Sequence, residues 1–102
     1  MDYVPLITPE KVAFIFETIE AAQVSITDFS HLVSTSRNSL HRWRNTGKVT
    51  DRLRFNLAYQ TALRMSYAIA DKKLPLPDKV AKAQRVSTLR KIIKDASHHI
   101  IQ

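Results

Sequence analysis

The sequence predicts an all-α fold of about five helices, and three observations support this prediction. The chain of 102 residues contains a single glycine, Gly47. No stretch shows the alternation of apolar and polar residues, bounded by turn residues, that is typical of a β-strand. Apolar residues instead recur at helical spacing, and residues that favour helix starts precede several of these runs. The length suits one continuous domain.

Two helices are expected in the first third of the chain. Thr8 can cap the first helix, Pro9 suits its first position, and Glu10 favours the positive end of the helix dipole. This helix is expected to end near Gln23, with an apolar face formed by Val12, Ile15, Phe16, Ile19 and Ala22. A short second helix follows the capping residues at positions 25–28, and its apolar face contains Phe29, Leu32 and Val33.

The third helix is expected from about Ser36 to Asn45, with Leu40 and Trp43 facing inward. Gly47 can adopt the left-handed conformation that closes a helix. Residues 1–48 therefore form a head of three short helices, and residues 49–102 form a helical core and pairing region.

The fourth helix is expected from Thr50 and Asp51 to about Lys72, and it has two apolar stripes. The first stripe comprises Leu53, Leu57, Thr61, Met65 and Ile69, and the second comprises Phe55, Tyr59, Leu63 and Tyr67. One stripe can face the core, whereas the other needs a different partner. We assign Phe55, Tyr59, Leu63 and Tyr67 to oligomerisation.

A fifth helix is expected from about Asp78 to His98, after residues 74–77 (Leu-Pro-Leu-Pro) break the fourth. Its apolar residues alternate steps of three and four, which is typical of a short heptad seam. The seam comprises Val86, Leu89, Ile93, Ala96 and Ile100. We assign Val86, Leu89 and Ile93 to the oligomer interface.

Charge is distributed unevenly along the chain, whose formal net charge is +7. Residues 1–35 contain one basic and five acidic side chains, whereas residues 36–102 contain fifteen basic and four acidic ones. A polyanion is a natural partner for such a surface, because neutralised phosphates release condensed counterions. The alternative is a solvated basic face that only confers solubility.

Several classes of protein are disfavoured by composition. The chain has no cysteine, which excludes disulfides, thiolate metal sites and cysteine nucleophiles. No apolar run is long enough to span a bilayer and no signal peptide is evident, so we expect a soluble, cytoplasmic protein. No serine has a recognisable base and acid, and one glycine cannot form a phosphate-binding loop, so no enzyme is expected. We expect neither metal nor cofactor, since the histidines (His31, His41, His98 and His99) lack carboxylates or cysteines at ligand spacing.

Residues 26–45, ITDFSHLVSTSRNSLHRWRN, resemble the helix-turn-helix of bacterial and phage DNA-binding regulators. Phe29, Val33, Leu40 and Trp43 match the four apolar side chains that the family buries between its two helices. Ser30 matches the small residue at their closest approach. Ser36 matches the hydroxyl that caps the recognition helix, and polar residues follow it where the family faces the groove. Two positions depart from the pattern, because Ser34 replaces the usual turn glycine and Thr35 replaces Val or Ile.

The resemblance implies that the third helix reads double-stranded DNA in the major groove. At about 100° per residue, Asn38, His41, Arg42 and Asn45 point outward from this helix, with Arg37 and Ser39 on its flanks. Arg37, Asn38, Ser39, His41 and Arg42 are the candidate base-reading residues. The candidate phosphate contacts are Ser36, Arg44, Asn45, Lys48, Arg52 and Arg54.

In size and layout the chain is similar to small lysogeny regulators of lambdoid phages and to Cro and repressor proteins. This similarity implies a phage or mobile-element transcriptional regulator, a repressor or an activator, that binds two half-sites as a homodimer. Two alternatives stay open. The chain could be a DNA-marking assembly subunit for packaging or partition, or an adaptor whose helix-turn-helix contacts another protein.

Overall fold

The computed structural model describes residues 6–96 and confirms the expected all-α fold with about five helices. The helices are α1 (Pro9–Ala21), α2 (Ile26–Val33), α3 (Arg37–Thr46), α4 (Arg52–Ala70) and α5 (Arg85–Ala96), and a 3-10 turn, η1 (Lys82–Gln84), leads into α5. None of these helices has the length and apolar character needed to cross a membrane.

Four helices begin at the capping residues that the sequence indicates. The side chains of Thr8, Ser25, Ser36 and Asp51 each accept a hydrogen bond from the backbone N–H three residues later, at 3.2, 3.0, 3.1 and 3.0 Å. These bonds satisfy N–H groups that have no partner within the helix. The first turns of α1, α2, α3 and α4 are therefore set by local chemistry.

The fifth helix begins later than the sequence indicates. Its expected start was Asp78, but residues 77–80 form a turn in which the Val80 N–H donates to the Pro77 carbonyl at 3.1 Å, and α5 itself starts at Arg85. Leu74 and Leu76 are buried in the core, at 3% and 7% exposure, so this proline-rich segment is anchored to the core. The expected end at His98, and the seam residue Ile100, lie outside the described residues.

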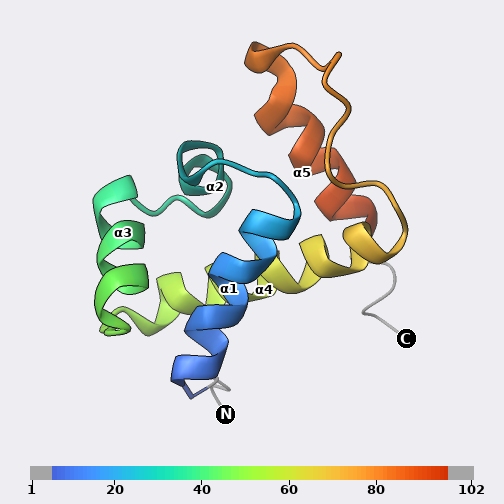
Figure 1. Ribbon diagram of the computed structural model, residues 1–102. Helices are drawn as coiled ribbons and strands as arrows, with labels where there is room; N and C mark the ends of the chain where they lie inside the picture. Colours follow the sequence, from blue (N-terminus) through green and yellow to red (C-terminus); the bar gives the residue numbers. More distant parts are fainter. Residues whose placement is uncertain (1–5, 97–102) are drawn as a thin grey trace.

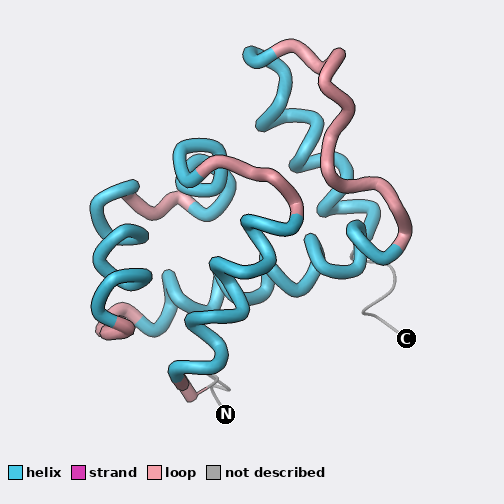
Figure 2. Tube along the Cα trace, in the orientation of Figure 1, coloured by secondary structure: helices cyan, strands magenta, loops and turns pink. Residues whose placement is uncertain are grey.

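The five helices enclose one core (Figure 1). α1 crosses α4, α3 lies along one edge, and α5 lies on the opposite side beside the loop that connects it to α4 (Figure 2). The buried cluster includes residues of the first three helices, such as Ile15 and Phe29, together with residues of the last two, such as Phe55 and Leu89. The head and the helical region after residue 48 thus share a single hydrophobic core.

The inward face of α4 differs from either stripe that i, i+4 spacing suggested. Phe55, Ala58, Ala62 and Met65 are fully buried, and they follow one another at steps of three, four and three. Alanines on this face allow α1 to cross α4 closely. The assignment of Phe55 to oligomerisation is therefore wrong for this conformation, because its side chain belongs to the core of the single chain.

Candidate nucleic-acid interface

The turn between α2 and α3 consists of residues 34–36. Ser34 ends α2 in the left-handed region, with φ 52° and ψ 39°, where the family resemblance would place glycine. Thr35 is 2% exposed, and its N–H donates to the Ser30 carbonyl at 3.2 Å. The Thr35 hydroxyl donates to the Val33 carbonyl at 3.3 Å, so its polar atoms are satisfied although they are buried. Ser34 and Thr35, the two residues that differ from the family pattern, thus form a turn whose backbone and side-chain hydrogen bonds are made.

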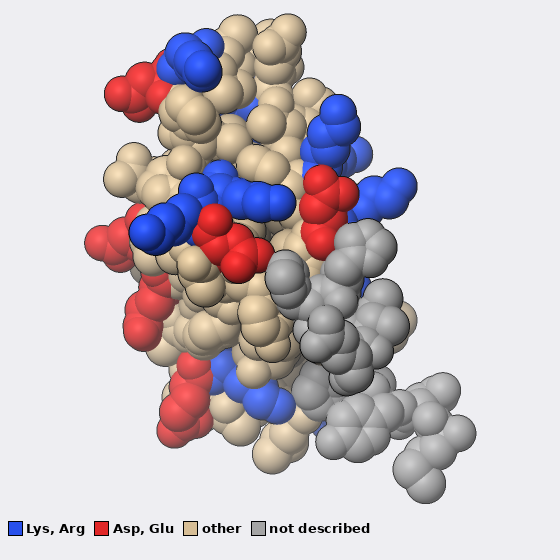
Figure 3. Space-filling model, turned by 90° about the vertical axis from the view of Figure 1, so that its right-hand side faces the viewer, with Lys and Arg blue, Asp and Glu red and all other residues tan. Residues whose placement is uncertain are grey.

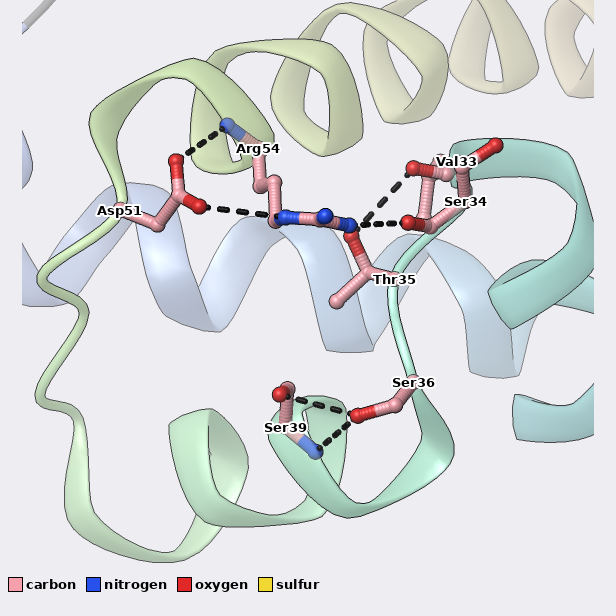
Figure 4. A network of polar contacts seen from close by, with 7 residues as sticks. All are labelled: Val33, Ser34, Thr35, Ser36, Ser39, Asp51 and Arg54. Atoms are coloured by element: carbon pink, nitrogen blue, oxygen red, sulfur yellow. Dashed lines mark hydrogen bonds and ion pairs between the residues drawn. The ribbon is translucent and has the colours of Figure 1, made fainter.

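A polar contact from α4 holds this turn from outside (Figure 4). The Arg54 guanidinium donates through Nη1 to the Ser34 carbonyl and pairs through Nε with Asp51 Oδ2 at 3.1 Å. Arg54 was expected to contact phosphate, but the structure engages its guanidinium within the chain. An exposed ion pair of this kind contributes about 0.2–1 kcal/mol. Arg54 therefore positions the turn that leads into α3.

Leu40 and Trp43 anchor the inner face of α3, as the sequence predicts. Leu40 is fully buried and Trp43 is 3% exposed. The ring of Trp43 lies 6.2 Å from that of Phe55 on α4, and Phe55 stacks on Tyr59 at 6.1 Å, centroid to centroid. Such ring pairs stabilise packing beyond the area they bury. Side chains on the opposite face of α3 are thereby displayed from a fixed support.

Both ends of α3 are closed by local hydrogen bonds. At its start, Ser36 Oγ accepts from the Ser39 N–H at 3.1 Å and bonds the Ser39 hydroxyl at 3.0 Å (Figure 4). At its end, Gly47 adopts φ 70° and its N–H donates to the Trp43 carbonyl at 2.7 Å. The Thr46 hydroxyl donates to the Arg42 carbonyl at 2.7 Å and accepts from the Lys48 N–H at 3.1 Å. These contacts define a helix of ten residues.

The outer face of α3 contains the candidate base-reading residues. Arg37, Asn38 and Arg42 are exposed, whereas Ser39 and His41 are half-buried. Residues 36–54 contain six basic side chains and one acid, Asp51, which is the acid that pairs with Arg54. No carboxylate of α3 itself would oppose a polyanion on this face.

Of the candidate phosphate contacts, five are exposed side chains at the ends of α3 or just beyond it, namely Ser36, Arg44, Asn45, Lys48 and Arg52. Arg44 is exposed, and its Nη2 lies 3.2 Å from Nδ1 of His41. Arg44 also lines a shallow hollow with Phe16 and Glu20 of α1. Arg44 therefore lies on the side of α3 that faces the acidic surface of α1.

The residues assigned to oligomerisation do not form one surface. Phe55, Leu89 and Ile93 are buried within the chain, at 0%, 1% and 8% exposure. Tyr59, Leu63 and Val86 are half-buried, and only Tyr67 is exposed, at 41%. In their place, α4 exposes Leu53 at 76% and Leu57 at 44%. Leu89, Ile93 and Ala96 of the seam belong to the core of the single chain, because α4 packs against α5.

The charge distribution differs on the side away from α3. Figure 3 views the molecule from the right-hand side of Figure 1, where α5 and its connecting loop lie, and acidic and basic side chains interleave on this face. Glu10, Glu17 and Glu20 of α1 are also exposed, but Glu17 and Glu20 lie nearer to α3, where they line a shallow hollow with Arg44. Among residues 6–96, no three histidine or carboxylate side chains gather in a group that could hold a metal ion; His98 and His99 lie outside this range.

Comparison of the chain with protein-family models, curated protein sequences and solved structures found no match.

Proposed function

We propose that this protein is a sequence-specific double-stranded DNA-binding protein that inserts α3 into the major groove. The observation that supports the proposal best is the two-sided character of α3. Leu40 and Trp43 fix its inner face to the core, while Arg37, Asn38 and Arg42 are exposed on a helix without acidic residues. A rigidly held cationic helix at one edge of a small domain suits insertion into a groove.

The angle between α2 and α3 supports the same proposal. In Figure 1, α2 is seen almost end-on, whereas α3 lies close to the plane of the picture, so the two helices cross steeply. A steep crossing lets the second helix project from the domain while the first lies above it. The short turn at residues 34–36, held by Arg54, maintains this arrangement.

Each exposed side chain of α3 has a defined recognition chemistry. An arginine can donate two hydrogen bonds to guanine O6 and N7, and an asparagine can bond adenine N6 and N7. Each such pair contributes about 1–3 kcal/mol of discrimination between bases. Lys48 and Arg52 are exposed beyond the end of α3, and we assign them to phosphates, which fix the register on the duplex.

A regulator of transcription that binds as a homodimer is the specific form that we propose. One recognition helix makes few base contacts, and pairing two heads places two helices about 34–36 Å apart on one face of the duplex. Leu53 and Tyr67 are large apolar side chains that α4 leaves exposed, and we assign them to pairing. The role in transcription is supported by the family resemblance of residues 26–45.

The test is selection of binding sites from a random duplex pool, followed by fluorescence anisotropy over a salt series. We expect affinity that falls steeply with salt, and a loss of about 5- to 150-fold in Arg42→Ala and in Arg37→Ala, which corresponds to 1–3 kcal/mol. Lys73→Ala is the matched control, because it removes one exposed charge beyond the far end of α4.

Three results would contradict parts of this proposal. Absence of duplex binding would refute the function. Full affinity in both arginine variants would refute the assignment of α3 as the reading helix. Light scattering that finds assemblies larger than a dimer, together with weak sequence preference, would favour a DNA-marking assembly subunit.

A further inference from the structure

A second candidate site is a cavity between α2, α4 and α5. Its volume is about 280 Å³. Leu32 of α2, Leu57 of α4 and Ile93 of α5 supply apolar walls. The volume is close to the lower limit of ligand pockets, which is about 300 Å³. The cavity therefore suits a small molecule with an apolar portion.

The charged residues that line this cavity are all basic: Arg64 of α4, and Arg90 and Lys94 of α5. The Nε atom of Arg64 is buried and has no hydrogen-bond partner in the described part of the chain. A buried donor without an acceptor is unfavourable, so a ligand acceptor that reaches the Arg64 guanidinium would bring a gain. Arg90 is fixed at the cavity by a hydrogen bond from its Nη2 to the His31 carbonyl, at 3.0 Å.

We propose that this cavity binds a small organic anion, a carboxylate that bears a short alkyl or aryl chain. The carboxylate accepts hydrogen bonds from Arg64 and Arg90, and the apolar chain covers Leu32, Leu57 and Ile93. Inorganic phosphate would leave the apolar walls uncovered, and an uncharged apolar molecule would leave the Arg64 donor unpaired. The cavity thus selects for both properties in one ligand.

A larger hollow of about 770 Å³ lies beside the start of α2, but its chemistry is different. Lys79, Lys82 and Arg85 line it together with Asp28 and Asp78, so both signs of charge are present. An anion has less reason to prefer that hollow. It provides an internal comparison for mapping the site.

The experiment is isothermal titration of the intact protein with hexanoate, with 1-hexanol and with acetate, in the absence of DNA. We expect saturable binding of one hexanoate per chain, and at least tenfold weaker binding of the alcohol and of acetate. Arg64→Met keeps most of the apolar stem of the side chain but removes the donors, and it should weaken hexanoate binding at least tenfold. Lys73→Met is the control and should leave binding unchanged.

Amide chemical-shift mapping in the unmodified protein locates the site without any substitution. Hexanoate should shift the signals of Leu32, Leu57 and Ile93. Shifts confined to the larger hollow, or equal affinity for hexanoate and 1-hexanol, would overturn the proposal. An acidic amphipathic peptide that binds the same residues far more tightly than hexanoate would overturn it in favour of a protein partner. Because no DNA is present, each outcome is independent of the function proposed above.

Discussion

Replacing Gly47 by alanine is expected to lower the free energy of unfolding by about 1 kcal/mol. Gly47 closes α3 with φ 70° and ψ 4°. A residue with a Cβ pays roughly 1–2 kcal/mol in the left-handed region. Alanine regains about 0.4–1 kcal/mol of this, because its unfolded chain has less conformational freedom than that of glycine. No neighbouring heavy atom lies within 4 Å of an added Cβ, so no clash increases the loss.

Urea unfolding measures this effect, with the fluorescence of Trp43 as the signal. Trp43 is the only tryptophan and is buried on α3, so its emission reports the release of that helix. Gly47→Asn is the control and should lose less stability, since asparagine tolerates the left-handed region better than alanine. Increased stability in Gly47→Ala, or equal losses in the two variants, would refute the reasoning about this backbone position.

Three further predictions concern α3 and its supports, and the same unfolding assay checks them. Ser34→Gly should raise the free energy of unfolding by up to about 1 kcal/mol, because glycine adopts the left-handed backbone conformation of this position without strain. A lower free energy of unfolding would contradict a left-handed conformation at residue 34. Ser36→Ala should lower the free energy of unfolding by about 1 kcal/mol, because it removes the side chain that caps α3. Ser39→Ala should lower it less, because the Ser39 backbone N–H still donates to Ser36 Oγ. A larger loss in Ser39→Ala than in Ser36→Ala would contradict this cap. Phe55→Ala should lower the free energy of unfolding by about 3–5 kcal/mol, whereas Ala70→Gln, at an exposed position of the same helix, should change it by less than about 0.5 kcal/mol. Similar losses in the two variants would contradict the inward face of α4.

Local chemistry explains why much of the fold could be predicted from the sequence. The caps at Thr8, Ser25, Ser36 and Asp51 act within four residues of the chain, so their effect can be recognised without tertiary information. The left-handed closure at Gly47 is equally local. The helix boundaries that depend on these residues were predicted to within one or two positions.

Features that depend on tertiary packing were not predictable in the same way. Spacing alone offered two apolar stripes for α4 and could not identify a mixed inward face that relies on Ala58 and Ala62. The start of α5 was misplaced because the burial of Leu74 and Leu76 outweighs the helical pattern of the segment after them.

Part of the candidate site also depends on distant contacts. The exposed face of α3 followed from helical geometry, and Arg37, Asn38 and Arg42 are exposed. The contact of Arg54 with the Ser34 carbonyl joins residues twenty positions apart, and no local pattern indicates it. Asp51 and Arg54 are three residues apart at a helix start, and this spacing predicts their ion pair. It does not predict the contact of Arg54 with Ser34.

Methylation interference on a selected duplex tests most directly whether α3 lies in the major groove. Dimethyl sulfate modifies guanine N7 in the major groove and adenine N3 in the minor groove. The account predicts that N7 methylation blocks binding at two clusters of guanines about one helical turn apart, and that Arg42→Ala becomes insensitive at the guanine it reads. Interference at adenine N3 alone, or an unchanged pattern in both Arg37→Ala and Arg42→Ala, would contradict it.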